Sequence, residues 1–198
     1  MAETSSAKVI VISGPAGSGK TTLCDRLLAE KPDHLARVVT STTRQPRPGE
    51  EHGIDYYYFS AEDFLAKVEA GDFYEYAQVH ANRYGTLKSE VDDKLAAGTD
   101  VLLNIDVQGA AAWRKVAAEN PKLSGRLVTI FVNVSPEQMR ERIIGRGDND
   151  EEDIARRIRT AEQETARADE FDHVIESSDK ERDYQALCAI YRRIKASA

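Results

Sequence analysis

The stretch VIVISGPAGSGKTT, Val9 to Thr22, decides the fold expected of this chain. Its first four residues are β-branched and apolar, as in a strand buried within a parallel sheet. The residues after Ser13 fit the pattern G-x-x-x-x-G-K-[ST], and helical apolar spacing begins at Leu23. A strand, a glycine-rich loop and a helix in this order predict a phosphate-binding loop at a helix N-terminus.

This loop predicts a site for a nucleoside triphosphate. Backbone N–H groups would converge on phosphate oxygens, Lys20 would reach the β- and γ-phosphates, and the Thr21 hydroxyl would bind Mg²⁺. The alternative is a glycine-rich turn that happens to carry a lysine, which would not need the flanking strand and helix. The residues expected to bind ATP are Gly14, Pro15, Ala16, Gly17, Ser18, Gly19, Lys20, Thr21 and Thr22.

Composition narrows the class of protein. A chain of 198 residues is most simply one domain, and its net charge of -7 argues against a nucleic-acid-binding or membrane-binding surface. No stretch approaches the roughly 18 apolar residues of a membrane span, and no signal peptide is evident. Cys24 and Cys188 form no C-x-x-C pair, so neither zinc nor a disulfide framework is expected. A cytoplasmic location is predicted.

Beyond the loop, apolar strands alternate with helical patterns. Strands are expected at 37–39, 100–105, 126–132 and 173–175, and helices at 21–30, 88–97, 107–119, 136–145, 151–170 and 180–195. Boundary signals include Ser60, Gly71, Gly98 and a capping box at Ser135. This alternation predicts an α/β fold, a P-loop parallel sheet flanked by helices.

The segment from about 41 to 87 interrupts the alternation. It contains short aromatic strands, one small helix and six of the eight tyrosines, so it predicts an inserted α+β lobe with a pocket lined by rings and hydroxyls. Arg44 and Arg47 offer bidentate donors for a second phosphate, on a loop stiffened by two prolines. The alternative for these arginines is a solvated basic turn.

Glu75 favours the binding site over the solvated turn. It lies among Phe73, Tyr74 and Tyr76, where an unpaired buried carboxylate would be unfavourable. A guanine edge offers two adjacent donors, N1–H and N2–H₂, which one carboxylate can accept together and which adenine lacks. Hydroxyls for guanine O6 could come from Thr40, Ser41 or Thr86.

The chain resembles the guanylate kinase family of nucleoside monophosphate kinases. The matching segments, in family order, are SGPAGSGKTT (13–22), STTRQPRPGEEHGIDY (41–56), FYEYAQVHANRYGT (73–86), LNIDVQG (103–109) and the GRG with its flanking arginines (142–157). The resemblance implies one domain over 1–198, with a core at about 8–40 and 88–198, a GMP-binding insertion at 41–87 and a helical lid at 136–160. It also implies phosphorylation of GMP, and of dGMP, by ATP with Mg²⁺.

The resemblance further implies residue roles. The GMP-binding set would be Thr40, Ser41, Arg44, Arg47, Tyr56, Glu75, Tyr84, Thr86 and Asp106. The catalytic set would be Lys20, Arg44, Arg142, Arg146 and Arg157, the last three acting from the lid, with Thr21 and Asp106 at the metal. Two departures from the family pattern are Asn104, where an acid is common, and VIESSDK (174–180), which replaces a V-x-N-D-D-like run near the adenine.

Two alternative functions are open at this point. An enzyme on the same scaffold could take another acceptor, such as a phosphorylated ribose, but it would not need Glu75 and Thr86 arranged for a purine edge. A catalytically silent interaction module would commonly carry a degraded phosphate loop, whereas this loop is complete. No obligatory protein partner is expected.

Overall fold

The computed structural model describes residues 7–79, 81–144 and 151–196, and its central element is a five-stranded parallel sheet. The strand order is β2-β7-β1-β8-β9, and every neighbouring pair is parallel. The strands are β1 (Val9–Ser13), β2 (Leu35–Arg37), β7 (Asp100–Asn104), β8 (Leu127–Asn133) and β9 (His173–Glu176).

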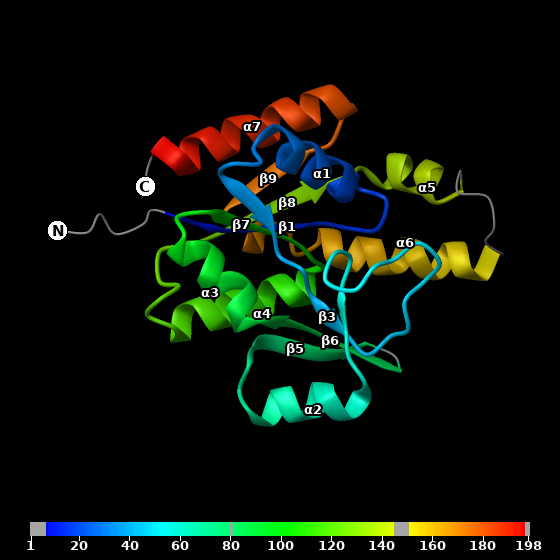
Figure 1. Cartoon of the computed structure of the whole chain (residues 1–198). Coiled ribbons are helices and arrows are strands. Elements are labelled where there is room, and N and C mark those ends of the chain that lie inside the picture. Colours follow the sequence, from blue (N-terminus) through cyan, green and yellow to red (C-terminus); the bar gives the residue numbers. More distant parts are fainter. Residues whose placement is uncertain (1–6, 80, 145–150, 197–198) are drawn as a thin grey trace.

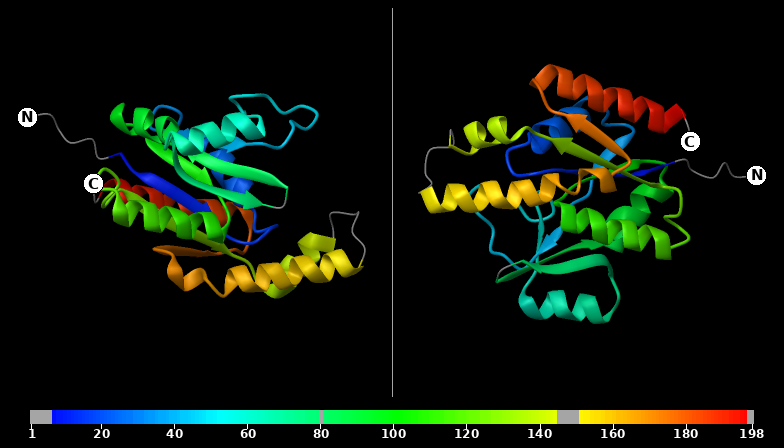
Figure 2. Two further views of the ribbon diagram at one scale, coloured as in Figure 1. Left: turned by 90° about the horizontal axis from the view of Figure 1, so that it is seen from below. Right: turned by 180° about the vertical axis from the view of Figure 1, so that it is seen from behind.

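Helices cover both faces of this sheet (Figures 1 and 2). They are α1 (Lys20–Glu30), α3 (Lys88–Ala96), α4 (Val107–Glu119), α5 (Pro136–Ile144), α6 (Glu151–Thr165) and α7 (Lys180–Ala196), with a 3₁₀ turn at Ala168–Glu170. Alternate side chains of β1 enter opposite cores: Val9 and Val11 pack with residues of α3 and α4, and Ile10 and Ile12 with residues of α1 and α7. The α/β fold class is therefore confirmed.

Helices α5 and α6, where the sequence predicted a lid, lie at the carboxyl ends of the parallel strands (Figure 1). Their apolar contact is a small cluster that includes Val134, Met139 and Ala161. The helix expected at 151–170 is shorter, because the 3₁₀ turn follows Thr165. The strand expected at 37–39 was also misplaced by two residues, since β2 pairs Leu35 with Asp100 and Arg37 with Leu102.

A second sheet occupies the segment that breaks the alternation. Its order is β4-β3-β6-β5, from β3 (Ser41–Thr42), β4 (Tyr57–Tyr58), β5 (Phe73–Val79) and β6 (Asn82–Leu87), with α2 (Ala61–Glu69) packed against it. Phe64 of α2 stacks on Phe73 with 4.6 Å between ring centroids. Tyr74 packs against Trp113 of α4 and donates to Asp92 of α3, which attaches this sheet to the core.

The boundary signals behave as their chemistry predicts. Ser60 caps α2 by accepting from the Asp63 N–H, and Ser135 accepts from the Gln138 N–H at 3.3 Å. Gly71 and Gly98 follow their helices with positive φ. Within the described ranges, no helix combines the length and apolar character that a membrane crossing requires.

Candidate active site

The phosphate loop joins β1 to α1 in a conformation that requires glycine. Gly14 has φ 141°, and a Cβ there would lie 2.4 Å from the Val132 carbonyl oxygen of the adjacent strand. Gly17 and Gly19 also have positive φ, at 85° and 91°. The loop backbone is thus folded close to β8 and leads directly into the first turn of α1.

Lys20 and Thr21 begin α1 beside this loop. The Lys20 ammonium donates to the carbonyl oxygens of Gly14 and Pro15, the latter at 2.9 Å, so it spans the loop. The Thr21 hydroxyl accepts from Asn104 at 3.1 Å, at the end of the neighbouring strand β7. Asn104, noted above as a departure from the family pattern, therefore contacts a residue expected to bind the metal.

A cavity of about 490 Å³ separates the second sheet from β7 and α4, and we call it the acceptor cavity. It gathers five of the residues predicted to bind GMP although they are far apart in sequence. These are Thr40, Tyr56, Glu75, Tyr84 and Asp106. The Asp106 carboxylate caps α4 by accepting from the Gly109 N–H at 2.8 Å.

Glu75 is positioned by its strand register. It lies opposite Thr86 after an irregularity in the β5–β6 pairing, and the buried Thr86 hydroxyl donates to its Oε1 at 2.7 Å. Burial raises the pKa of the Glu75 carboxyl; the Thr86 hydrogen bond opposes this rise, and the charge of Asp106 adds to it. Ser41 is buried on β3, and its hydroxyl has no hydrogen-bond partner among the described residues.

Arg44 is held by a carboxylate that the sequence analysis missed, Glu50. Two Arg44–Glu50 nitrogen–oxygen distances are 2.9 Å, and Glu50 also accepts from the Tyr58 hydroxyl and the Arg47 N–H. The Arg44 guanidinium, aided by these two donors, lowers the pKa of Glu50 to about 2. Glu50 follows Arg44 within an irregular loop, so no period in the sequence marked the pairing. Arg47 itself is exposed and is absent from the acceptor cavity's lining.

A second cavity, of about 360 Å³, lies between the phosphate loop and α7, and we call it the donor cavity. Its lining residues are Gly17, Ser18, Gly19, Thr22, Leu23, Arg26, Arg142, Lys180, Asp183 and Tyr184. Arg142 of α5 donates to the Gly17 carbonyl at 3.2 Å, so this predicted lid arginine contacts the phosphate loop. Arg157 is exposed on α6, and Arg146 lies outside the described residues.

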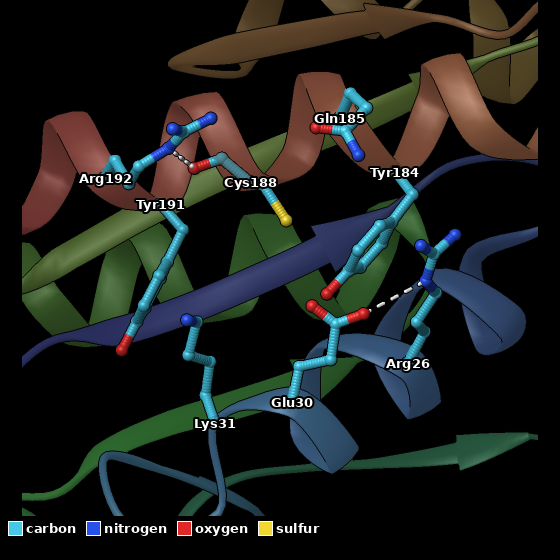
Figure 3. A pocket seen from close by; sticks show the side chains of 8 residues that line it. All are labelled: Arg26, Glu30, Lys31, Tyr184, Gln185, Cys188, Tyr191 and Arg192. Carbon is cyan, nitrogen blue, oxygen red and sulfur yellow. Dashed lines mark hydrogen bonds and ion pairs between the residues drawn. The ribbon is translucent and has the colours of Figure 1, made fainter.

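Arg26 and Tyr184 separate the donor cavity from a smaller one between α1 and α7 (Figure 3). The Arg26 guanidinium lies over the Tyr184 ring, 3.7 Å from its centroid, and pairs with Glu30 and Glu181. In Figure 3 the Tyr184 ring reaches down from α7 towards Glu30 on α1. These contacts fix one wall of the donor cavity by joining α1 to α7.

A phosphate loop with one cavity beside it and a second cavity beneath the inserted sheet is typical of one class of protein, the P-loop kinases. Comparison with known proteins gives the family. The family model described as guanylate kinase matches residues 6–193. The chain therefore belongs to the guanylate kinase family, whose enzymes phosphorylate GMP to GDP with ATP. The resemblance, the enzyme class and the phosphorylation of GMP by ATP that the sequence predicted are confirmed.

Individual relatives agree with this membership. A guanylate kinase of Rubrobacter xylanophilus is 42% identical over 190 residues, covering 96% of this chain and 95% of the relative. A guanylate kinase of Hahella chejuensis is 39% identical, covering 93% of this chain and 86% of the relative. The crystal structure of guanylate kinase from Anaplasma phagocytophilum superposes with a TM-score of 0.71 at 29% identity, covering 96% of this chain and 86% of that one.

Proposed function

We propose that GMP binds in the acceptor cavity, that ATP binds along the phosphate loop and donor cavity, and that the γ-phosphoryl group passes between them in line. The observation that carries this proposal is the convergence of Thr40, Tyr56, Glu75, Tyr84 and Asp106 on one cavity. Among the residues that the structure describes, none lines both the donor and the acceptor cavity, so each nucleotide would contact its own set of residues.

Glu75 reads the guanine edge in this proposal. Thr86 occupies one acceptor direction of its Oε1, which leaves the carboxylate able to accept from N1–H and N2–H₂ of guanine. Thr40 and Ser41 are the further hydroxyls near the base. dGMP carries the same guanine edge and the same phosphate, so we expect it to be a substrate as well.

The GMP phosphate is held by Arg44, Arg47, Tyr56 and Tyr84. The Arg44 guanidinium lies 5.4 Å from the Tyr56 ring centroid, and the Tyr56 and Tyr84 rings are 6.2 Å apart, which supports a common site. A guanidinium has five N–H donors, so Arg44 can hold Glu50 and a phosphate oxygen together. Glu50 would then hold Arg44 in place. The Glu50 carboxylate already shows that the Arg44 guanidinium accommodates an anion at this position.

Mg²⁺ would be held by the Thr21 hydroxyl and the Asp106 carboxylate together with ATP phosphates. These are hard oxygen donors, and Mg²⁺ in nucleotide sites takes one or two protein oxygens plus phosphates and waters. Asp106 uses Oδ1 for its helix cap and follows the end of β7 by two residues. Thr21 lies in the first turn of α1 and accepts from Asn104, the last residue of β7. When bound, the ion would neutralise charge on the transferring phosphates.

The protein's part in the reaction is alignment and charge neutralisation. Phosphoryl transfer passes through a loose transition state with charge on the equatorial oxygens. Lys20 and Arg44 would stabilise that charge from the core and the inserted lobe, and Arg142, Arg146 and Arg157 would do so from the lid. The GMP phosphate is already anionic, so no general base is required.

We also propose the following organisation. The whole chain acts as one cytoplasmic domain, with its core at about 8–40 and 88–198, a GMP-binding lobe at 41–87 and a lid at 136–160. The lobe and lid close over the bound nucleotides, which limits transfer to water.

The test is an ADP-release assay with MgATP and separate acceptors: GMP, dGMP, AMP, CMP, UMP and a ribose phosphate. We expect turnover with GMP and dGMP alone. Turnover with the ribose phosphate alone would overturn the acceptor assignment. No turnover by folded protein that binds GMP would point to an interaction module.

Glu75→Gln tests the reading of the base. It replaces an acceptor with an amide donor opposite guanine N2–H₂, so the KM for GMP should rise roughly ten- to a hundredfold, as for a lost hydrogen bond to a charged group. Glu90→Gln is the matched control, because Glu90 is a partly buried lobe-facing carboxylate bound to Tyr57 and Lys94 and outside the acceptor cavity. An unchanged KM for GMP in Glu75→Gln would remove Glu75 from the role.

A further inference from the structure

A chain of hydrogen bonds runs from α7 to the phosphate loop. Asp183 lies in α7 and is only 6% exposed. Its Oδ2 accepts from the Ser177 hydroxyl at 2.6 Å and its Oδ1 from the Ser178 N–H at 2.8 Å. Both serines belong to the turn between β9 and α7. The carboxylate is thus fixed by the turn that precedes its own helix.

Ser177 links the Asp183 carboxylate to Arg142 by a second hydrogen bond. An ionised carboxylate is an acceptor only, so the Ser177 proton points at Asp183 and the lone pairs of the hydroxyl oxygen are available elsewhere. Arg142 donates to that oxygen through Nη2 at 3.4 Å and to the Gly17 carbonyl through Nη1 at 3.2 Å. One guanidinium therefore bridges the β9–α7 turn and the phosphate loop.

We infer that Asp183 is a positioning residue for the donor nucleotide, and that it acts through Ser177 on Arg142. The inference rests on the proposed ATP site, whose cavity Gly17, Arg142 and Asp183 all line. Arg142 reaches this cavity from α5, the first lid helix. Without the link, its long side chain would have to be ordered by the nucleotide itself, which weakens binding because ordering such a side chain is unfavourable.

The charge of the Asp183 carboxylate supports its role in positioning Arg142. A nearly buried carboxylate is stable only when it is paired or hydrogen-bonded, and Asp183 has two neutral donors with the Arg142 guanidinium one hydrogen bond further on. The network also gives a function to part of the VIESSDK departure. Ser177 supplies a hydroxyl that can donate to Asp183 and accept from Arg142 at once.

Three substitutions test the link. Ser177→Ala removes it, Ser177→Thr keeps the hydroxyl, and Asp183→Asn weakens the anionic end. The control is Asp179→Asn in the same turn: Asp179 is exposed, caps α7 by accepting from the Glu181 and Arg182 N–H groups, and stands outside the network. For each protein, MgATP affinity is measured by calorimetry without acceptor, and KM is measured for ATP and for GMP.

Ser177→Ala and Asp183→Asn should raise the Kd and KM for ATP roughly three- to tenfold, which corresponds to the nucleotide ordering one long side chain, Arg142, by itself. The KM for GMP should not change, because the acceptor cavity has other walls. Ser177→Thr should restore ATP affinity, and Asp179→Asn should match the parent. In an Arg142→Ala background, Ser177→Ala should add nothing further.

Other outcomes would overturn the inference. Parental ATP affinity in Ser177→Ala, or an equal further loss in the Arg142→Ala background, would show that Asp183 does not act through Arg142. Parallel rises in KM for ATP and GMP with a lowered Tm would indicate a structural role alone. A parent chain that binds no MgATP would instead overturn the proposed function, which the calorimetry detects independently of turnover.

Discussion

Glu75, which the sequence predicted to bind guanine, has a pKa that its surroundings shift. Its burial raises its pKa, so protonation begins at a higher pH than for an exposed glutamate. A protonated carboxyl has lost acceptor capacity and cannot take both guanine donors. Acidic pH should therefore weaken GMP binding through this residue.

We expect the KM for GMP to rise as the pH falls from 7 towards 5, while the KM for ATP changes less. In Thr86→Val the rise should begin at higher pH, because the hydrogen bond that lowers the Glu75 pKa is lost. The folded-state pKa of Glu75 exceeds its unfolded value, so protonation of Glu75 favours the folded state as the pH falls, and this residue does not itself destabilise the protein in acid. Superimposable pH profiles for the parent and Thr86→Val would contradict this account.

Lys20 is the second residue whose role can be isolated. Lys20→Met keeps a chain of similar length but removes the charge that spans the Gly14 and Pro15 carbonyls. We expect kcat to fall about 10²- to 10³-fold, as when a preorganised transition-state donor is removed. Circular dichroism should show an intact fold. Near-normal turnover would exclude Lys20 from the transfer step.

At the scale of elements, the β5–β6 pair sets the geometry of the acceptor cavity. Gly85 lies between Tyr84 and Thr86, and a Cβ at this position would meet the Glu75 carbonyl oxygen at 2.9 Å and the Phe73 ring at 3.0 Å. A backbone oxygen cannot rotate away as a flexible side chain can. Any side chain at residue 85 must therefore move β5, the strand that carries Glu75.

Gly85→Ala should raise the KM for GMP about tenfold and leave the KM for ATP unchanged, since overpacking of about 1–3 kcal/mol is relieved by shifting β5. Steady-state kinetics with each substrate varied in turn measures this. Gly125→Ala is the control: Gly125 has φ +70°, and an added Cβ would have no heavy atom within 4 Å, so the substitution strains only the backbone before β8 and not β5 or β6. Equal rises in the KM for GMP and the KM for ATP would mean that the position of β5 does not affect GMP binding alone.

At the scale of the whole molecule, Asp100 ties together distant parts of the chain. It is fully buried at the start of β7 and accepts from the Lys8 N–H, the Tyr191 hydroxyl and the Lys195 ammonium at 2.8, 2.8 and 3.0 Å. Burial, and then the hydrogen bond to Asp100, raises the pKa of Tyr191. This carboxylate anchors the segment before β1 and the end of α7 to the central sheet.

Asp100→Asn should lower the free energy of unfolding by about 2–3 kcal/mol, below the full value for a broken buried pair because Lys195 is partly exposed. Urea unfolding measures this, and the activity per folded molecule should be retained. Lys195→Ala should lower the free energy of unfolding by less than Asp100→Asn does, because Asp100 then keeps two donors, the Lys8 N–H and the Tyr191 hydroxyl. Loss of activity without loss of stability would contradict a purely structural role.

Much of the fold could be predicted because its signals are local. The β1–loop–α1 unit, the alternation of strands and helices, and the Ser60 and Ser135 caps depend on residues within a few positions of each other. The predicted bounds were wrong for β2, because the position of this strand is set by its register with β7, which is distant in sequence. Glu50 was missed because its bond to Arg44 arises inside an irregular loop.

The sequence by itself determined the phosphate loop, the α/β class and the residue types available for a second nucleotide, since each follows from short-range spacing and side-chain chemistry. Only the tertiary structure decided that Thr40, Glu75 and Asp106 line one cavity, and that Ser177 joins Asp183 to Arg142. Such contacts join residues of separate elements, and sheet register and helix packing, which no local pattern encodes, bring those residues together.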